Sequence, residues 1–159
     1  MTILEYLPGI SHEYWRPYEA LRENLIIKKN TGSSLLPSSL LNHRGLFTSL
    51  NIIVNNPNLA FKITIDDRTI TGTPYYLNLY GFNFYIPDTP FIVEYNTTDN
   101  IYSMSFITST PGPFYENFDV VAENTTASDV TINVFQLHAY ILNKGFYREL
   151  AKLKSSQSH

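Results

Sequence analysis

Cysteine is absent from this chain of 159 residues, and charged residues make up only 16% of it. Without cysteine there is no disulfide framework and no thiolate metal site. The net charge is −3 with no basic block, so the footprint of a nucleic-acid-binding protein is missing. No apolar stretch approaches the ~20 residues that a membrane helix requires. The N-terminus lacks the basic region of a signal peptide. We therefore expect neither a nucleic-acid partner nor a membrane.

The sequence also lacks the common catalytic motifs. It contains no G-x-S-x-G, no phosphate-binding loop and no G-x-G-x-x-G. None of the histidines has the spacing of a metal site; they are His12, His43, His138 and His159. The adjacent Asp66 and Asp67 are more typical of a hairpin turn than of a catalytic pair. We predict that the protein is not an enzyme and binds no cofactor and no metal. A glycosidase pair among the scattered carboxylates is the open alternative, since the fold decides their separation.

An alternation of apolar and polar residues dominates residues 45–143. Leu46, Thr48, Leu50, Ile52 and Val54 fall on one face of an extended strand, which indicates a sheet with one buried face. Turn residues separate further segments, at 55–58, 66–68, 97–100, 110–113 and 124–129. We predict strands over residues 45–55, 59–66, 69–71, 74–80, 91–95, 101–108, 118–123 and 130–142.

These strands predict an all-β protein, a single antiparallel β-sandwich of the jelly-roll or immunoglobulin-like kind. In the last strand the apolar face changes after Val134, because Phe135 and Leu137 continue the pattern on the opposite side. A β-bulge near residues 134–135, or burial of both faces, explains the change. Either explanation places this strand near the middle of its sheet.

The flanking segments follow other patterns. Residues 1–44 are predicted to form an arm with a helix near residues 17–28, followed by a flexible break at 30–34 and a loop over 35–44. The arm packs on its own sandwich or reaches a neighbouring subunit; the sequence leaves both open. Residues 144–159 are predicted to form a short helix over 144–154 and a frayed tail. Phe146, Leu150 and Leu153 line one stripe of that helix.

Aromatic residues are the best indication of an interaction surface, because tyrosine combines a large apolar area with a polar tip. Packing in the core, a protein interface and a carbohydrate-stacking platform are all compatible with the pattern. The candidate interface residues are Tyr14, Trp15, Tyr18, Tyr75, Tyr76, Tyr80, Phe82, Phe84, Tyr85 and Phe146. Asn96 and Asn124 also begin glycosylation sequons on predicted turns.

The order of strand and turn signals resembles that of β-sandwich structural proteins from the virions of tailed phages and archaeal viruses. The residues that carry the resemblance are Gly45-Leu46-Phe47, Asn55-Asn56-Pro57, Ile63-Thr64-Ile65-Asp66, Gly72-Thr73-Pro74, Tyr80-Gly81-Phe82, Ile101-Tyr102, Pro113-Phe114 and Val121-Ala122-Glu123-Asn124. The resemblance implies a capsid, decoration, neck or tail component that is located in the virion. It also implies a homo-oligomer whose partners are copies of itself and other virion proteins. A carbohydrate-binding β-sandwich module is the alternative.

Overall fold

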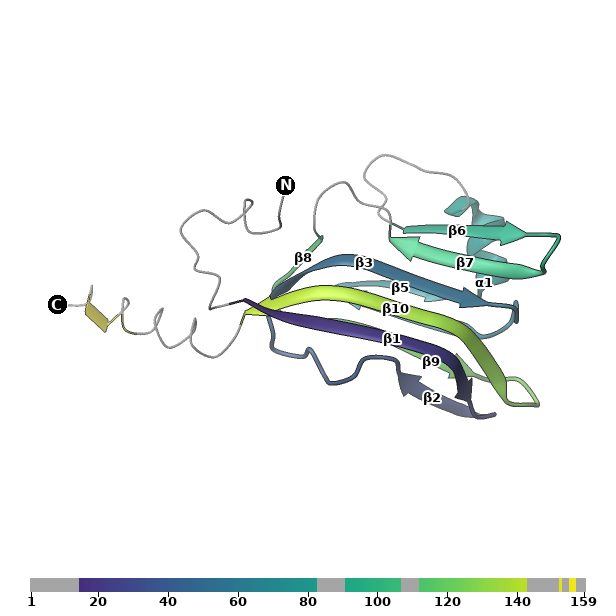
Figure 1. The fold of residues 1–159 in the computed structure, drawn as a ribbon, viewed down its shortest axis with the longest axis horizontal. Coiled ribbons are helices and arrows are strands. Elements are labelled where there is room, and N and C mark those ends of the chain that lie inside the picture. The colour runs from purple at the N-terminus through teal and green to yellow at the C-terminus, as the bar shows by residue number, and fades with distance from the viewer. Residues whose placement is uncertain (1–14, 83–90, 107–111, 143–151, 153–154, 157–159) are drawn as a thin grey trace.

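The computed structural model describes residues 15–82, 91–106, 112–142, 152 and 155–156 (Figure 1). Its strands form two antiparallel sheets, which confirms the all-β prediction. The six-stranded sheet has the order β1-β10-β3-β7-β6, and β8 also pairs with β3. Its strands are β1 (Trp15–Ile27), β3 (Gly45–Val54), β6 (Phe91–Asn96), β7 (Ile101–Phe106), β8 (Gly112–Phe114) and β10 (Val130–Leu142). The four-stranded sheet has the order β2-β9-β4-β5 and consists of β2 (Thr31–Ser34), β4 (Ala60–Ile65), β5 (Arg68–Gly72) and β9 (Phe118–Asn124).

One hydrophobic cluster contains residues from both sheets. The ring of Phe47 on β3 lies 5.0 Å from the ring of Phe106 on β7, and 5.2 Å from the ring of Phe118 on β9. Phe118 is fully buried. Burying a side chain of this size contributes about 1.5–3 kcal/mol. These aromatic contacts therefore join the two sheets directly.

The change of face predicted in the last strand is confirmed. The pairing of β10 with β3 shifts register between Ile132 and Val134, so Asn133 is the extra residue of a bulge. Val130 and Ile132 are buried before the bulge, and Phe135 and every second residue to Ile141 are buried after it. β10 also lies between β1 and β3, as its predicted central position requires.

The predicted faces of β3 need a correction. A second register shift lies where His138 and Ala139 face this strand, and it leaves Thr48 as the extra residue. Phe47 is consequently buried with Leu50, whereas Leu46 is only half-buried. A strict alternation from Leu46 to Val54 is wrong because it ignores this bulge.

The predicted helix near residues 17–28 is wrong, because this segment is the edge strand β1. This strand of thirteen residues pairs antiparallel with β10, from Trp15 opposite Leu142 to Ile27 opposite Val130. Asn24 has a positive φ of 52° and interrupts the alternation. Tyr18 and Ala20 are buried before it, and Ile27 is buried after it. An apolar alternation of every second residue that is interrupted once resembles the 3.6-residue spacing of a helix, which explains the error.

Two other predictions are corrected in part, and a third is confirmed. The break predicted at residues 30–34 contains the short strand β2, which pairs with β9. Of the turn predicted at 110–113, only residues 112 and 113 are described, and they belong to β8, which pairs with β3. The loop over 35–44 is confirmed, and its buried residues are Leu35, Leu36 and Leu40.

The strand predicted over residues 74–80 is helical instead. It consists of α1 (Pro74–Leu77) and the π-helical turn η3 (Asn78–Phe82). No helix among the described residues is long and apolar enough to cross a membrane. The predicted C-terminal helix over 144–154 lies outside the described residues, apart from Lys152.

Candidate functional site

Five tyrosines gather where the helical segment meets β6 and β7, and we call them the tyrosine cluster. They are Tyr75, Tyr76, Tyr80, Tyr95 and Tyr102. Tyr80 is 72% exposed, and Tyr75 and Tyr76 are about half-exposed at 48% and 50%. Leu79, which is 62% exposed, lies next to Tyr80 in the chain. Contiguous exposed apolar side chains of this kind mark interaction surfaces more often than scattered ones do.

Local sequence signals hold the helical segment in place. Thr73 caps α1 by accepting a hydrogen bond from the backbone N–H of Tyr76, at 3.3 Å. Pro74 follows at the first helical position, where its missing N–H has no cost. Gly81 has a φ of 98°, which other residues rarely adopt, and it kinks the backbone within η3. Leu77 is buried and fixes the segment to the core.

A side chain fastens the same segment to β6. The amide of Asn78 donates a hydrogen bond to the carbonyl oxygen of Val93, at 3.1 Å. Because Val93 is fully buried in β6, this bond ties η3 to the edge of the six-stranded sheet. The exposed tyrosines are thus presented on a constrained backbone, which reduces the entropy that binding would cost.

The rings within the cluster contact one another in different orientations. Tyr75 and Tyr76 are 5.3 Å apart between ring centroids and inclined at 74°, whereas Tyr76 and Tyr80 are 5.9 Å apart and inclined at 21°. Tyr95 stacks on Tyr102 at 4.5 Å. Burial raises the pKa of Tyr102 above its usual value of about 10, and the nearby hydroxyls of Tyr95 and Tyr75 raise it further. The hydroxyl of Tyr102 therefore stays neutral at physiological pH.

The remaining candidate interface residues are distributed differently. Tyr18 is buried in the core, and its hydroxyl exchanges hydrogen bonds with the backbone of Ser38. Trp15 is half-buried at the start of β1. The outer candidates Tyr14, Phe84, Tyr85 and Phe146 lie outside the described residues, and only the backbone of Phe82 is described. Sequence reasoning did not place Tyr95 or Leu79 in the candidate interface.

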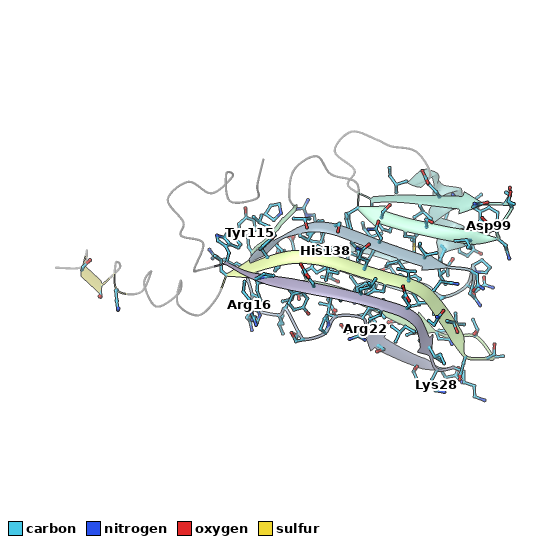
Figure 2. The ribbon with its side chains drawn as sticks, viewed as in Figure 1. Arg16, Arg22, Lys28, Asp99, Tyr115 and His138 are labelled. Atoms are coloured by element: carbon cyan, nitrogen blue, oxygen red, sulfur yellow. The ribbon has the colours of Figure 1, made fainter. Side chains whose placement is uncertain are left out.

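A polar row crosses the outer face of the six-stranded sheet at His138, midway along β10 (Figure 2). Glu19 Oε1 lies 3.4 Å from Nδ1 of His138, and Nε2 of Gln136 donates to Nε2 of the same ring at 3.1 Å. Asn51 in turn donates to Gln136 at 3.5 Å. Both imidazole nitrogens are thus engaged within the sheet, so this row serves to pair neighbouring strands.

A cavity of about 290 Å³ opens between β5 and the β3–β8 pair. Its lining is mainly apolar and includes Phe47, Ile63, Ile70 and Phe106, with Arg68 among the polar residues. Ligand pockets usually measure about 300–1,000 Å³.

Within the described residues, no group of His, Asp or Glu side chains gathers closely enough to hold a metal ion.

The two sequons differ in their surroundings. Asn124 is 1% exposed, and its side chain makes four hydrogen bonds. Its amide donates to the carbonyl oxygens of Ile27 and Ser128, and its Oδ1 accepts from the backbone and the hydroxyl of Thr126. Asn96 instead is exposed at the end of β6. Of the two, only Asn96 is accessible to modification in the folded protein.

Asp66 connects the β4–β5 hairpin to the turn before β9. Its Oδ1 accepts hydrogen bonds from the backbone N–H groups of Tyr115, Glu116 and Asn117, at 2.9, 2.8 and 3.1 Å. Burial alone would raise the pKa of this carboxyl. The three N–H groups, together with the charge of Arg68, outweigh that effect and hold its pKa below 3.8. The prediction that Asp66 forms a turn is confirmed, and the sequence held no signal for its three distant donors.

This depressed pKa predicts an acid-dependent loss of stability. The contribution of Asp66 is fully present above pH 3.8 and is lost as the pH falls through its lower folded-state pKa. Asp66→Asn keeps an acceptor and tolerates the positive φ of 56°, but it does not titrate. We expect the stability advantage of the wild type over Asp66→Asn to shrink as the pH falls below 3.8.

Urea unfolding midpoints, measured from about pH 6 to about pH 2, test this expectation. Asp67→Asn is the matched control, because the three hydrogen bonds are made by its neighbour. Parallel pH curves for the wild type and Asp66→Asn would contradict the linkage.

No protein-family model matches this chain, and no curated protein matches it either.

Proposed function

We propose that the protein is a non-enzymatic structural component of a virion, located in the particle, which assembles with copies of itself and with other virion proteins. The tyrosine cluster carries this proposal, since it combines a constrained backbone with three tyrosines that are at least about half-exposed. Tyrosine is enriched in the centres of protein interfaces. The virion as the setting is supported by the resemblance in the order of strands and turns.

The proposal includes a β-sandwich architecture of the jelly-roll or immunoglobulin-like kind, with the two sheets facing each other. The contact of Phe47 with Phe118 between the sheets supports it, as does the one hydrophobic cluster that draws on both. Such a scaffold presents its connections and edges to neighbours while its core stays closed.

A carbohydrate-binding module is the second candidate. Stacking on a sugar favours rings that share one plane, and Tyr76 and Tyr80 are inclined at only 21°. Tyr75 is inclined at 74° to Tyr76, however, so the cluster is not a flat platform. A protein surface can accommodate such mixed orientations, which favours assembly.

The test is the molar mass of the purified chain, measured by light scattering over a concentration series. We expect the wild type to form an oligomer. In the double variant Tyr76→Ser/Tyr80→Ser its dissociation constant should rise at least ~10-fold, as it does when interface hot spots are lost. Tyr115→Ser is the matched control, since Tyr115 is 60% exposed but belongs to the turn before β9. A wild type that is strictly monomeric and binds a glycan array would reverse the order of the two candidates.

A further inference from the structure

Charge is segregated along this chain. Between residues 69 and 143 there is no lysine or arginine, but there are seven acidic residues: Asp88, Glu94, Asp99, Glu116, Asp119, Glu123 and Asp129. The next eleven residues, 144–154, contain four basic residues and only Glu149 as an acid. The basic residues are Lys144, Arg148, Lys152 and Lys154. The C-terminal segment is therefore complementary in charge to the region that contains the tyrosine cluster.

The surroundings of the tyrosine cluster suit a basic, partly apolar segment. Glu94 on β6 and Asp99 in the β6–β7 turn are both exposed. Residues 74–106 contain no lysine or arginine that would pair with them. Exposed tyrosine faces also attract lysine and arginine through cation–π interactions. The apolar stripe predicted for the C-terminal segment, Phe146, Leu150 and Leu153, matches the apolar part of the same surface.

The tyrosine cluster lies far from the point where the C-terminal segment leaves the sheet. Leu142 ends β10 beside the start of β3, where its N–H donates to the carbonyl oxygen of Arg44 at 2.9 Å. Tyr102 pairs with Val54 at the opposite end of β3. Ten extended residues of β3 span about 30 Å. Figure 2 shows the same separation, with Asp99 at one end of the six-stranded sheet and Arg16, opposite Ile141, at the other.

We propose that residues 144–154 of one copy bind the tyrosine cluster of a second copy, with basic side chains near Glu94 and Asp99. A helix of eleven residues is only about 16 Å long, so the predicted helix cannot reach across its own subunit. Because the two surfaces lie at opposite ends, the contact is head-to-tail and builds rings or filaments. This inference rests on the proposed assembly function and names the partner segment.

The experiment uses two full-length variants that each alter one side of the contact. The tail variant carries Lys144→Glu, Arg148→Glu and Lys154→Glu, and the cluster variant carries Glu94→Lys and Tyr80→Ser. Light scattering over a concentration series should give each variant alone a dissociation constant at least ~10-fold higher than that of the wild type. Mixed together they should associate again, because the mixture contains one intact cluster and one intact tail. Added salt should weaken the wild-type oligomer.

Glu116→Lys/Tyr115→Ser is the matched control for the cluster variant, and it should leave the oligomer unchanged. Circular dichroism and urea midpoints confirm that each variant is folded. If the cluster variant weakens the oligomer but the tail variant does not, residues 144–154 are not the partner of the cluster, and the proposed assembly function stands. A mixture that fails to associate would also rule these residues out as the partner. A wild type that is monomeric throughout would refute the assembly function itself.

Discussion

Replacing Phe118 by alanine is expected to destabilise the protein by about 3–5 kcal/mol, the usual cost of emptying the site of a buried phenylalanine. Phe118 is fully buried on β9 and contacts Phe47 on β3 and Phe114 on β8, so its removal leaves a cavity between the two sheets. Because a domain has only about 5–15 kcal/mol of net stability, the loss is a large fraction of the total. Urea unfolding at neutral pH measures it.

Tyr115→Ala provides the control, since this aromatic residue lies three positions earlier and its side chain is 60% exposed. We expect its effect to stay within about 0.5 kcal/mol. Phe118→Leu keeps most of the buried area and should lie between the two. Equal effects of Phe118→Ala and Tyr115→Ala would contradict a core shared by the two sheets.

The second large effect is expected for Asn124→Ala. Asn124 is almost completely buried and supplies hydrogen bonds to the end of β1, through Ile27, and to the turn before β10, through Ser128 and Thr126. Truncation leaves the buried carbonyl oxygen of Ile27 without its partner, at a cost of about 1–3 kcal/mol, and it also removes the part-buried hydrogen bonds with Ser128 and Thr126. We expect a destabilisation of at least ~2 kcal/mol, measured by the same urea unfolding.

Asn96→Ala is the matched control for Asn124→Ala, because each asparagine ends a strand and begins an Asn-Thr-Thr triplet that connects to the next strand. Asn96 also accepts backbone hydrogen bonds, from Thr98 and Asp99, but it is exposed to water. Water replaces the lost bonds there, so we expect at most about 1 kcal/mol. A similar loss of stability at the two positions would show that the burial of Asn124 does not make its hydrogen bonds more important than those of Asn96.

The strands that alternate cleanly were predictable, and those that break the alternation were not. The sequence predicted β10 with the observed bounds and with its bulge, because an apolar residue recurs on each side of the phase change. A similar interruption concealed β1. The positive φ of Asn24 shifts the alternation by one residue, so Tyr18 and Leu25 face the same side although they are seven residues apart. Seven residues is also two turns of a helix, which is why the segment was predicted to be helical. α1 was missed because two neighbouring tyrosines suggested a strand, although Thr73-Pro74 is a helix-start signal.

The tyrosine cluster was predicted only in part. The sequence predicted that Tyr75, Tyr76 and Tyr80 are interface residues, and the structure places their rings in contact and exposes them. It also predicted Tyr18 in an interface, whereas this residue is buried beneath the 35–44 loop, with its hydroxyl bonded to Ser38. The local sequence pattern of β1 could not predict that contact, because Ser38 is twenty residues away in the chain.

The sequence by itself determined that the chain is all-β, because the alternation of apolar residues is a local property that each strand carries on its own. It also set the opposing charges of residues 69–143 and of the C-terminal segment. Only the tertiary structure decided which asparagine is buried, which N–H groups reach Asp66 and which tyrosines share a surface. Those outcomes depend on strand pairing between residues up to about a hundred positions apart, which no local pattern encodes.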